Sequence, residues 1–303
     1  MTRRFLGVGK VQVGLAIMAI FLIAAIIGQP LSQHVLGWTP YTYDQNALGA
    51  GPSAKHLLGT TSSGQDALSW LLYGTRNSML VGIASAVFGT AFTILVGLTG
   101  GFVGGFVDRL LNAVTLVFQN IPSFAVLFIV AGFLGSANWL VVSFIIGFFE
   151  WPGGARAVRA QAMSLRGRDF ATALRTIGES RWRVIMLEVL PHLMGVISPM
   201  FLRLIAAGIN QQAAIAFIGI GDAREPSWGL MINYANQQNA LFNGQWWWFG
   251  PPGLCLALVG LATTMINFGL DEVTNPTLSS KRIRLMRAFL RSKRSEAALV
   301  EAA

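Results

Sequence analysis

The feature that most constrains the fold is a series of long apolar runs that carry almost no charge. The first, at residues 11–28, is uncharged and just long enough to cross a bilayer as a helix. Further runs occupy residues 79–106, 110–134, 193–220 and 251–268, and another begins at Trp139. Charged residues make up 12% of the chain, whereas soluble domains contain about 25%. These runs predict an all-α polytopic membrane protein with six transmembrane helices.

The positive charge of the chain is confined to a few clusters. The formal net charge is +9, with seven Arg between Arg156 and Arg183 and seven Lys or Arg between Lys281 and Arg294. Further basic residues precede the first apolar run. Basic loops stay on the cytoplasmic side of a membrane and attract anionic lipid. We therefore predict a multi-pass protein of the plasma (inner) membrane with both termini in the cytoplasm, and the clusters give no reason to expect nucleic acid.

A basic, amphipathic segment at residues 168–191 separates two of the apolar runs. Phe170, Leu174 and Ile177 recur at the spacing of one helical face. Gly178 follows at the position that usually ends a helix in a left-handed turn. The segment predicts a short cytoplasmic helix, a glycine turn and a second short helix, with an apolar face that a partner must accept. A loop lying on the bilayer surface is the alternative interpretation.

This segment resembles the loop by which ABC-importer permeases dock on their ATPase subunit. The family pattern is Glu-Ala-Ala, followed by Gly and later by Leu-Pro. Thr172, Ala173 and Leu174 occupy the Glu-Ala-Ala places, and Gly178 and Pro191 match. Because Thr172 replaces the Glu, an ion pair made by that Glu is not expected here, whereas the docking shape is retained. The resemblance implies an ATPase-docking surface made by Phe170, Thr172, Ala173, Leu174, Arg175, Ile177, Gly178, Trp182 and Pro191.

A second stretch, residues 56–81, resembles the segment before the second span in the C-type permease of dipeptide and oligopeptide importers. Gly64, Gln65 and Asp66 stand where that family usually has Gly-Arg-Asp. Shorter matches to the family follow at residues 107–111, 155–160, 226–229 and 271–276. The resemblance implies the type I ABC-importer permease fold and import of dipeptides or oligopeptides. Oligosaccharides and nickel complexes are alternative substrates within this branch.

The resemblance also implies partners. A second homologous permease, two cytoplasmic ABC ATPase subunits or domains, and an extracellular substrate-binding protein are expected, all at a lipid bilayer. ATP and Mg are expected on the ATPases, and no cofactor on this chain. The mechanism implied is alternating access, in which ATP binding shifts the population of inward-facing and outward-facing states.

Polar residues inside two apolar runs are candidates for the substrate pathway. The run at residues 193–220 contains Arg203, Asn210, Gln211 and Gln212, and Glu150 lies in the run that begins at Trp139. Such groups are costly in a membrane and face other helices or water. Asn210, Gln211 and Gln212 cover adjacent directions on one turn, so at least one is expected to face the pathway. Interhelical hydrogen bonding is the alternative, as is an interfacial Glu150 that pairs with Arg156.

Glycine and proline positions predict how the helices pack and end. Gly97, Gly101 and Gly105 repeat at the four-residue spacing that allows close helix approach. Asp108-Arg109 is interpreted as the following turn. Pro122 is expected to kink the run at residues 110–134.

Two further local features concern the segments outside the runs. Ser62 or Ser63 is expected to cap an interfacial helix, and a catalytic role for them with Asp66 is less favoured because no His lies nearby in the sequence. Residues 246–249, three Trp and a Phe, predict an aromatic girdle at the outer interface.

The sequence predicts no catalytic or metal site, and hence no enzyme. It lacks a phosphate-binding Gly-x-x-x-x-Gly-Lys-Ser/Thr motif, and its single Cys255 allows no intrachain disulfide. An ion-coupled secondary transporter is a rival, with Glu150 as its one candidate carboxylate and no evident inverted repeat. An intramembrane protease is another rival, but the runs show neither a Ser–His nor a paired-Asp site.

The chain is accordingly divided into four regions. Residues 1–30 are the cytoplasmic start and first span, and residues 31–75 an external loop with an interfacial helix. Residues 76–276 are the transmembrane core, with the docking loop at residues 160–191. Residues 277–303 form a basic cytoplasmic tail.

Overall fold

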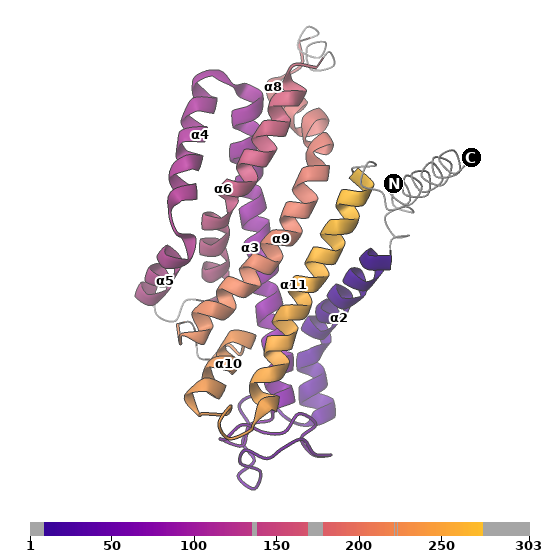
Figure 1. Ribbon diagram of the computed structural model, residues 1–303, viewed down its shortest axis with the longest axis vertical. Coiled ribbons are helices and arrows are strands. Elements are labelled where there is room, and N and C mark those ends of the chain that lie inside the picture. Colours follow the sequence, from indigo (N-terminus) through magenta and orange to yellow (C-terminus); the bar gives the residue numbers. More distant parts are fainter. Residues whose placement is uncertain (1–8, 135–137, 169–177, 221, 223, 275–303) are drawn as a thin grey trace, which may run out of the picture.

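The computed structural model describes residues 9–134, 138–168, 178–220, 222 and 224–274. Within these residues the protein is a bundle of helices and contains no β-strand (Figure 1). The helices are α2 (Gly9–Leu31), η1 (Ser32–Leu36), α3 (Ala67–Val103), α4 (Gly105–Asn120), α5 (Ser123–Leu134), α6 (Trp139–Arg166), α8 (Arg181–Arg183), η2 (Val184–Val189), α9 (Leu190–Phe217), α10 (Trp228–Gln237) and α11 (Trp246–Thr274). We refer below to the α8 end and the α10 end of this bundle. The all-α prediction is confirmed for the described residues.

The number of membrane spans is four or five by length and apolar composition. The four are Gly9–Leu36, Ala67–Val103, Val184–Phe217 and Trp246–Leu270, and α4 with α5 forms a fifth if the bent pair is one span. The helix α6 is not among them, and it carries Glu150 and three Arg. The structure therefore supports a polytopic membrane protein without confirming the expected count of six.

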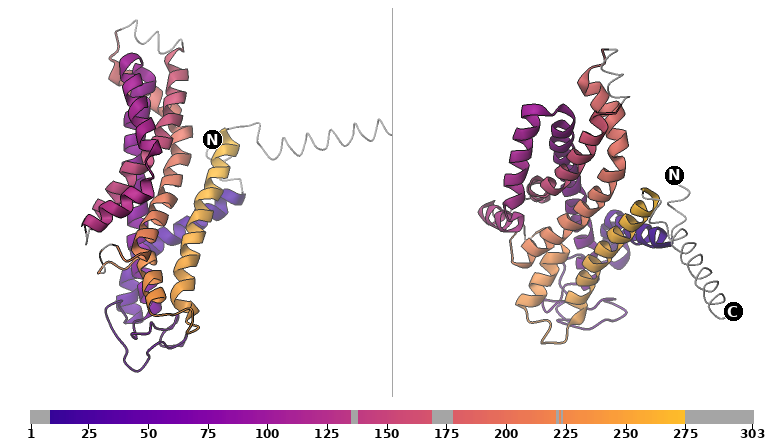
Figure 2. Two further views of the ribbon diagram at one scale, coloured as in Figure 1. Left: turned by 60° about the vertical axis from the view of Figure 1, so that its left-hand side comes forward. Right: turned by 45° about the horizontal axis from the view of Figure 1, so that its top comes forward.

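The helix α3 is the central element of the bundle, and it packs most extensively on α6 and next on α9 (Figures 1 and 2). It joins the expected interfacial helix and the second span into one helix of 37 residues. Its cap is Asp66, whose Oδ1 accepts a hydrogen bond of 2.7 Å from the backbone N–H of Ser69. The expectation of a Ser62 or Ser63 cap is therefore wrong, because the chain enters the helix four residues after Ser62.

Two of the three spaced glycines create the α3–α6 contact. A Cβ on Gly97 would lie 2.5 Å from the carbonyl oxygen of Ala155, and one on Gly101 would lie 2.5 Å from that of Arg159. Only glycine allows the two backbones to approach this closely. Gly105 does not belong to this pattern, because it begins α4 and nothing lies within 4 Å of where its Cβ would be.

The turn between α3 and α4 lies earlier than the sequence suggested. Gly104 and Gly105 form it, with φ angles of +74° and +63° that favour glycine. Asp108 is instead in the first turn of α4. Its two carboxylate oxygens accept hydrogen bonds from Nε and one terminal nitrogen of Arg159, at 2.5 and 2.8 Å. This bidentate pair ties α4 to α6 at the α8 end.

Pro122 breaks the third apolar run as expected, and more sharply than a kink. The axes of α4 and α5 differ by 76° across Ile121 and Pro122. Proline has no N–H to donate and disfavours a helical conformation in the residue before it. Ile121 is accordingly extended, with φ −77° and ψ 125°.

The aromatic residues at the start of α11 differ in their surroundings, so the girdle prediction holds only in part. Trp246 is 56% exposed and Trp248 is buried. The indole N–H of Trp247 donates to the carbonyl of Thr60 at 3.0 Å. Two of the three Trp therefore hold the α10 end together rather than facing outward.

Candidate functional site

The first candidate is a polar cluster halfway along the bundle, where α5, α6 and α9 meet. The side-chain amide of Gln211 donates to Oε1 of Glu150 at 2.6 Å, and the hydroxyl of Ser123 donates to the same oxygen at 3.2 Å. A guanidinium nitrogen of Arg203 lies 3.9 Å from Oε2 of Glu150. We call Glu150, Gln211, Arg203 and Ser123 the Glu150 cluster.

The Glu150 cluster brings together three of the five pathway residues expected from the sequence. The Glu150 side chain is 17% exposed and that of Arg203 is 52% exposed, so the cluster reaches the surface of this chain. Arg156 donates to Oε1 of Gln119 at 2.8 Å, and the alternative in which it pairs with Glu150 is wrong. The carboxylate of Glu150 thus has its partners on α5 and α9.

The cluster lies at the break between α4 and α5. Ser123 is the first residue of α5, directly after Pro122. The break thus places a hydroxyl from a third helix against the carboxylate that α6 and α9 share. Among the described residues, Oε1 of Gln211 is buried without a hydrogen-bond partner, so the cluster retains an acceptor for water or a solute.

The two other expected pathway residues are not part of the Glu150 cluster. Asn210 is exposed. Gln212 accepts a hydrogen bond of 3.4 Å from the hydroxyl of Ser78 on α3 and lines a separate cavity. Each residue turns a helix by about 100°, so three consecutive polar residues face three different surroundings.

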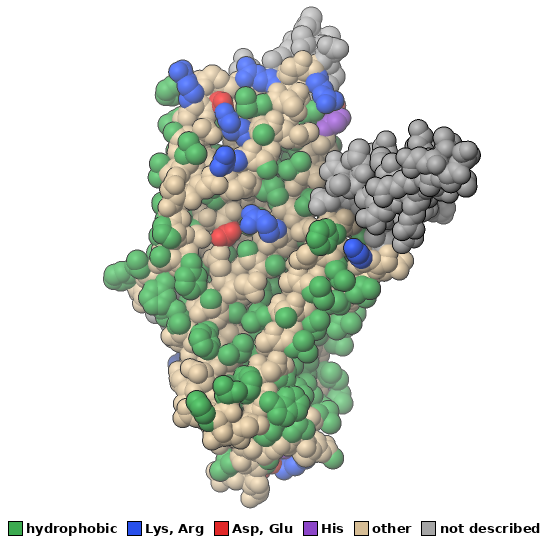
Figure 3. All heavy atoms as spheres, viewed as in Figure 1, with side chains coloured by type: hydrophobic (Ala, Val, Ile, Leu, Met, Phe, Trp, Pro, Cys, Tyr) green, Lys and Arg blue, Asp and Glu red, His purple; other side chains and the backbone are tan. Residues whose placement is uncertain are grey.

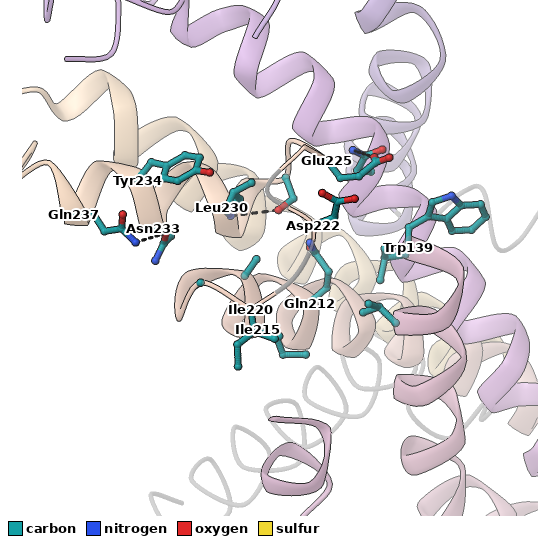
Figure 4. Close-up of a pocket in the computed structure, with 16 residues that line it drawn as sticks. Trp139, Gln212, Ile215, Ile220, Asp222, Glu225, Leu230, Asn233, Tyr234 and Gln237 are labelled. Atoms are coloured by element: carbon teal, nitrogen blue, oxygen red, sulfur yellow. Dashed lines mark hydrogen bonds between the residues drawn. The ribbon is translucent and has the colours of Figure 1, made fainter. Parts of the chain in front are cut away.

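That separate cavity lies at the α10 end and has a volume of about 150 Å³. Its walls come from α3, the start of α6, the end of α9, residues 219–227 and α10. Figure 4 shows Asp222 and Glu225 on the same side of it as Trp139, with Asn233, Tyr234 and Gln237 on α10. We call it the α10 cavity.

Hydrogen bonds hold the acidic wall of the α10 cavity in place. The side-chain amide of Asn77 donates to Oε2 of Glu225 and to the carbonyl of Pro226, both at 2.8 Å. Oδ1 of Asp222 accepts from the backbone N–H of Arg224 at 2.9 Å. The hydroxyl of Tyr41 donates to the carbonyl of Arg224 at 2.7 Å. The loop that carries both carboxylates is thus tied to α3 and to the 37–66 loop.

The 37–66 loop contains a buried charged network that sequence reasoning missed. The imidazole of His56 lies between two carboxylates, with Nδ1 at 2.9 Å from Asp66 and Nε2 at 3.3 Å from Asp44. Lys55 also bonds Asp44. The hydrogen bond from Lys55, then those from Asn46 and His56, lower the pKa of Asp44 to about 2.

The one feature of the sequence that could have indicated this network is the short separation, ten residues, between His56 and Asp66. The loop brings these two residues into contact. Asp66 both caps α3 and binds His56. Both roles are explained by fixing the loop on the bundle, although a His in contact with Asp66 was not expected from the sequence.

The predicted ATPase-docking surface is described only in part. Phe170, Thr172, Ala173, Leu174, Arg175 and Ile177 lie outside the described residues. Gly178 has φ +85°, which confirms the left-handed turn. After it, Trp182 is 61% exposed, and Arg183 pairs with Glu179 at 3.3 Å.

The second short helix of this segment is continuous with α9. The π-helix η2 follows α8 directly and leads into α9, with the backbone N–H of Leu190 bonded to the carbonyl of Ile185, five residues earlier. Pro191, which has no N–H, follows within the first turn of α9. Val184, Ile185 and Val189 are buried against α3 and α6. The segment that follows Gly178 is therefore packed against α3, α6 and α9 through these side chains.

Comparison with known proteins places these features in a family. Residues 89–279 match the family described as the binding-protein-dependent transport system inner membrane component. The chain is 32% identical over 285 residues to the oligopeptide transport system permease protein OppC of Mycobacterium tuberculosis (strain H37Rv), covering 92% of this chain and 94% of that protein.

A second relative is a dipeptide permease. The dipeptide transport system permease protein DppC of Bacillus subtilis (strain 168) is 28% identical over 267 residues, which cover 88% of this chain and 81% of that protein. The family match at residues 89–279 includes the Glu150 cluster, Gly178 and α10. This chain belongs to the family of inner-membrane components of binding-protein-dependent transport systems.

Proposed function

We propose that this chain is the permease subunit of an ATP-driven ABC importer that carries dipeptides or oligopeptides across the plasma membrane. The observation that carries the proposal is the similarity, over most of the chain, to two proteins named as oligopeptide and dipeptide permeases. The same architecture importing an oligosaccharide or a nickel complex is the alternative. The chain itself is a non-catalytic subunit.

The proposed topology has six spans, with α6 as the one that apolar composition alone does not identify. At 28 residues, α6 is long enough, since a helix rises about 1.5 Å per residue and the hydrocarbon core is about 30 Å thick. Its three Arg all lie in the half nearer the α8 end. On the face in Figure 3, most Lys and Arg gather near that end. This distribution supports a cytoplasmic α8 end with both termini in the cytoplasm.

The proposed assembly contains a second homologous permease, two cytoplasmic ATPases that hold ATP and Mg, and an extracellular binding protein. The docking segment at residues 168–191 joins the ATPase to α9 through η2, and to α3 and α6 through the buried Val184, Ile185 and Val189. A movement imposed there by ATP binding would tilt these helices together. Co-purification tests this assignment, because the ATPases should remain bound to the full chain in mild detergent. Their absence from a correctly inserted chain would contradict it.

The Glu150 cluster is proposed to line the translocation pathway. It contains a paired charge and a free acceptor, reaches the surface of this chain, and joins three helices at the break after Pro122. Hydrogen bonds of this type can be exchanged for bonds to the backbone of a passing peptide. Because the bonds connect α5, α6 and α9, they would also change when those helices tilt.

Gln211→Leu is expected to reduce peptide uptake severalfold, because it removes the bond to Glu150 and leaves the carboxylate less satisfied. Hydrogen bonds between helices in membranes contribute about 0.6–2 kcal/mol. Asn210→Leu, on the adjacent exposed position, is the matched control and should transport normally. Uptake of a labelled dipeptide, normalised to the amount of assembled transporter, measures both. Equal uptake by the two variants would show that the Glu150 cluster serves only the packing of the helices.

A further inference from the structure

We propose that the α10 cavity is a binding site for an organic ammonium group. This inference rests on the proposed function for its biological meaning, in which the ammonium belongs to a free peptide arriving from outside. The physical argument stands on the lining of the cavity alone. It starts from charge: among the described lining residues, Asp222 and Glu225 are the only charged side chains.

The position of the two carboxylates makes them available to a ligand. Glu225 is exposed and Asp222 is half-buried, so solvent reaches both from the α10 end. Asn77 donates to only one carboxylate oxygen of Glu225, and the backbone of Arg224 to one of Asp222. The side chain of Arg224 is exposed and does not line the cavity. A bound cation would therefore meet two negatively charged carboxylates that hydrogen bonds hold in place.

The end of α9 adds to the negative potential. Ile215 and Ala216, in the last turn of this helix of 28 residues, and Gly219 just after it line the cavity. The carboxyl end of a helix carries a partial negative charge, which favours cations. The carbonyl of Phe217 already accepts a hydrogen bond from Asn233, another lining residue.

The same two carboxylates affect the phenol of Tyr41, which lies outside the cavity. Burial raises the pKa of Tyr41 above its ordinary value of 10.0, and Glu225, Tyr73 and Asp222 raise it further. Both carboxylates are thus close enough to Tyr41 to disfavour its ionised form.

The remaining walls suit an ammonium group on a carbon chain. Trp139 and Tyr234 contribute aromatic rings, which attract cations over their faces. Val81, Val142 and Ile215 contribute apolar surface for the carbon atoms. The volume of about 150 Å³ far exceeds the ~10–15 Å³ that one water requires.

The test is binding of two small probes to the whole transporter in lipid nanodiscs, without the binding protein. Alaninamide carries an ammonium group and N-acetylalaninamide does not. Ligand-observed NMR should show alaninamide bound to the wild type. Asp222→Asn and Glu225→Gln should each weaken it, and the double variant should weaken it by about tenfold or more, since charge-assisted hydrogen bonds are lost. Gln238→Ala, at an exposed residue that follows α10 and does not line the cavity, should bind like the wild type.

Three results would overturn the inference: no binding of alaninamide to the wild type, equal binding to the double variant, or equal binding of the neutral probe. Each single variant changes one accessible side chain without changing its shape. Weaker binding by the single variants therefore shows that the loss in the double variant does not come from unfolding. Peptide uptake by the wild type is measured separately. Uptake without alaninamide binding would contradict the ammonium site and leave the importer assignment intact. Alaninamide binding without uptake of any peptide would support the ammonium site and contradict the importer assignment.

Discussion

Gly178→Val and Leu174→Asp are expected to leave the chain in the membrane while removing most of its association with the ATPase. Gly178 has φ +85°, and a β-branched side chain at such an angle is strained by about 1–3 kcal/mol. No atom of the described residues lies within 4 Å of where its Cβ would be, so the expected effect comes from the backbone angle rather than from a clash with them. Leu174 belongs to the predicted apolar face, and burying one such side chain contributes roughly 1.5–3 kcal/mol.

These losses correspond to an affinity for the ATPase that is lower by about tenfold to a hundredfold. The spans themselves should be unaffected, since Gly178 lies outside the helices. Co-purified ATPase and peptide-stimulated ATP hydrolysis should therefore fall together. Gly178→Asn is the matched control, because Asn tolerates left-handed angles, and Leu174→Met is the control that keeps apolar volume. Full recovery of ATPase with both disruptive variants would favour the alternative of a loop on the bilayer surface.

Gly101→Leu and Gly97→Leu are expected to prevent assembly of the transmembrane core. A Cβ at Gly101 would lie 2.5 Å from the carbonyl oxygen of Arg159 and 2.8 Å from the Cβ of Ala162. Backbone cannot yield as a flexible side chain does, so α3 and α6 would have to separate. The cost of such overpacking is about 1–3 kcal/mol or more, a factor of about ten or more in the folded population. Separation would also stretch the Asp108–Arg159 pair at the same end.

Gly260→Leu is the control for this packing prediction, because it lies within α11 and nothing lies within 4 Å of where its Cβ would be. Both sets of variants are compared by the yield of monodisperse protein extracted from membranes. The α3 variants should be strongly depleted and Gly260→Leu recovered like the wild type. Normal yields of Gly101→Leu would show that the α3–α6 approach is looser than the structure has it.

Local signals in the sequence predicted the helices, the break at Pro122 and the left-handed turn at Gly178, because each depends on a residue and its immediate neighbours. Contacts between distant helices could not be predicted in this way. Glu150 contacts Arg203 and Gln211 because of how α6 and α9 are rotated about their own axes where the two helices pack together. A rotation of one residue separates Gln211 from Gln212, and hence the Glu150 cluster from the α10 cavity.

The errors had similar physical causes. Ser62 and Asp66 are both good capping residues, and the choice between them depended on how the 37–66 loop folds around His56. Asp108 was assigned to a turn because Asp is common in turns. Its partner Arg159, 51 residues away, instead holds it on a helix. The apolar composition of α6 does not identify it as a span because the helix carries Glu150 and three Arg.

The most direct test of the central claim is uptake of labelled dialanine by proteoliposomes that contain this chain, its partner permease and the ATPases. The account predicts uptake that requires ATP on the ATPase side and binding protein on the other side, and that is lost with Gly178→Val. Uptake driven by a proton or sodium gradient without ATP would contradict the account and favour the secondary transporter.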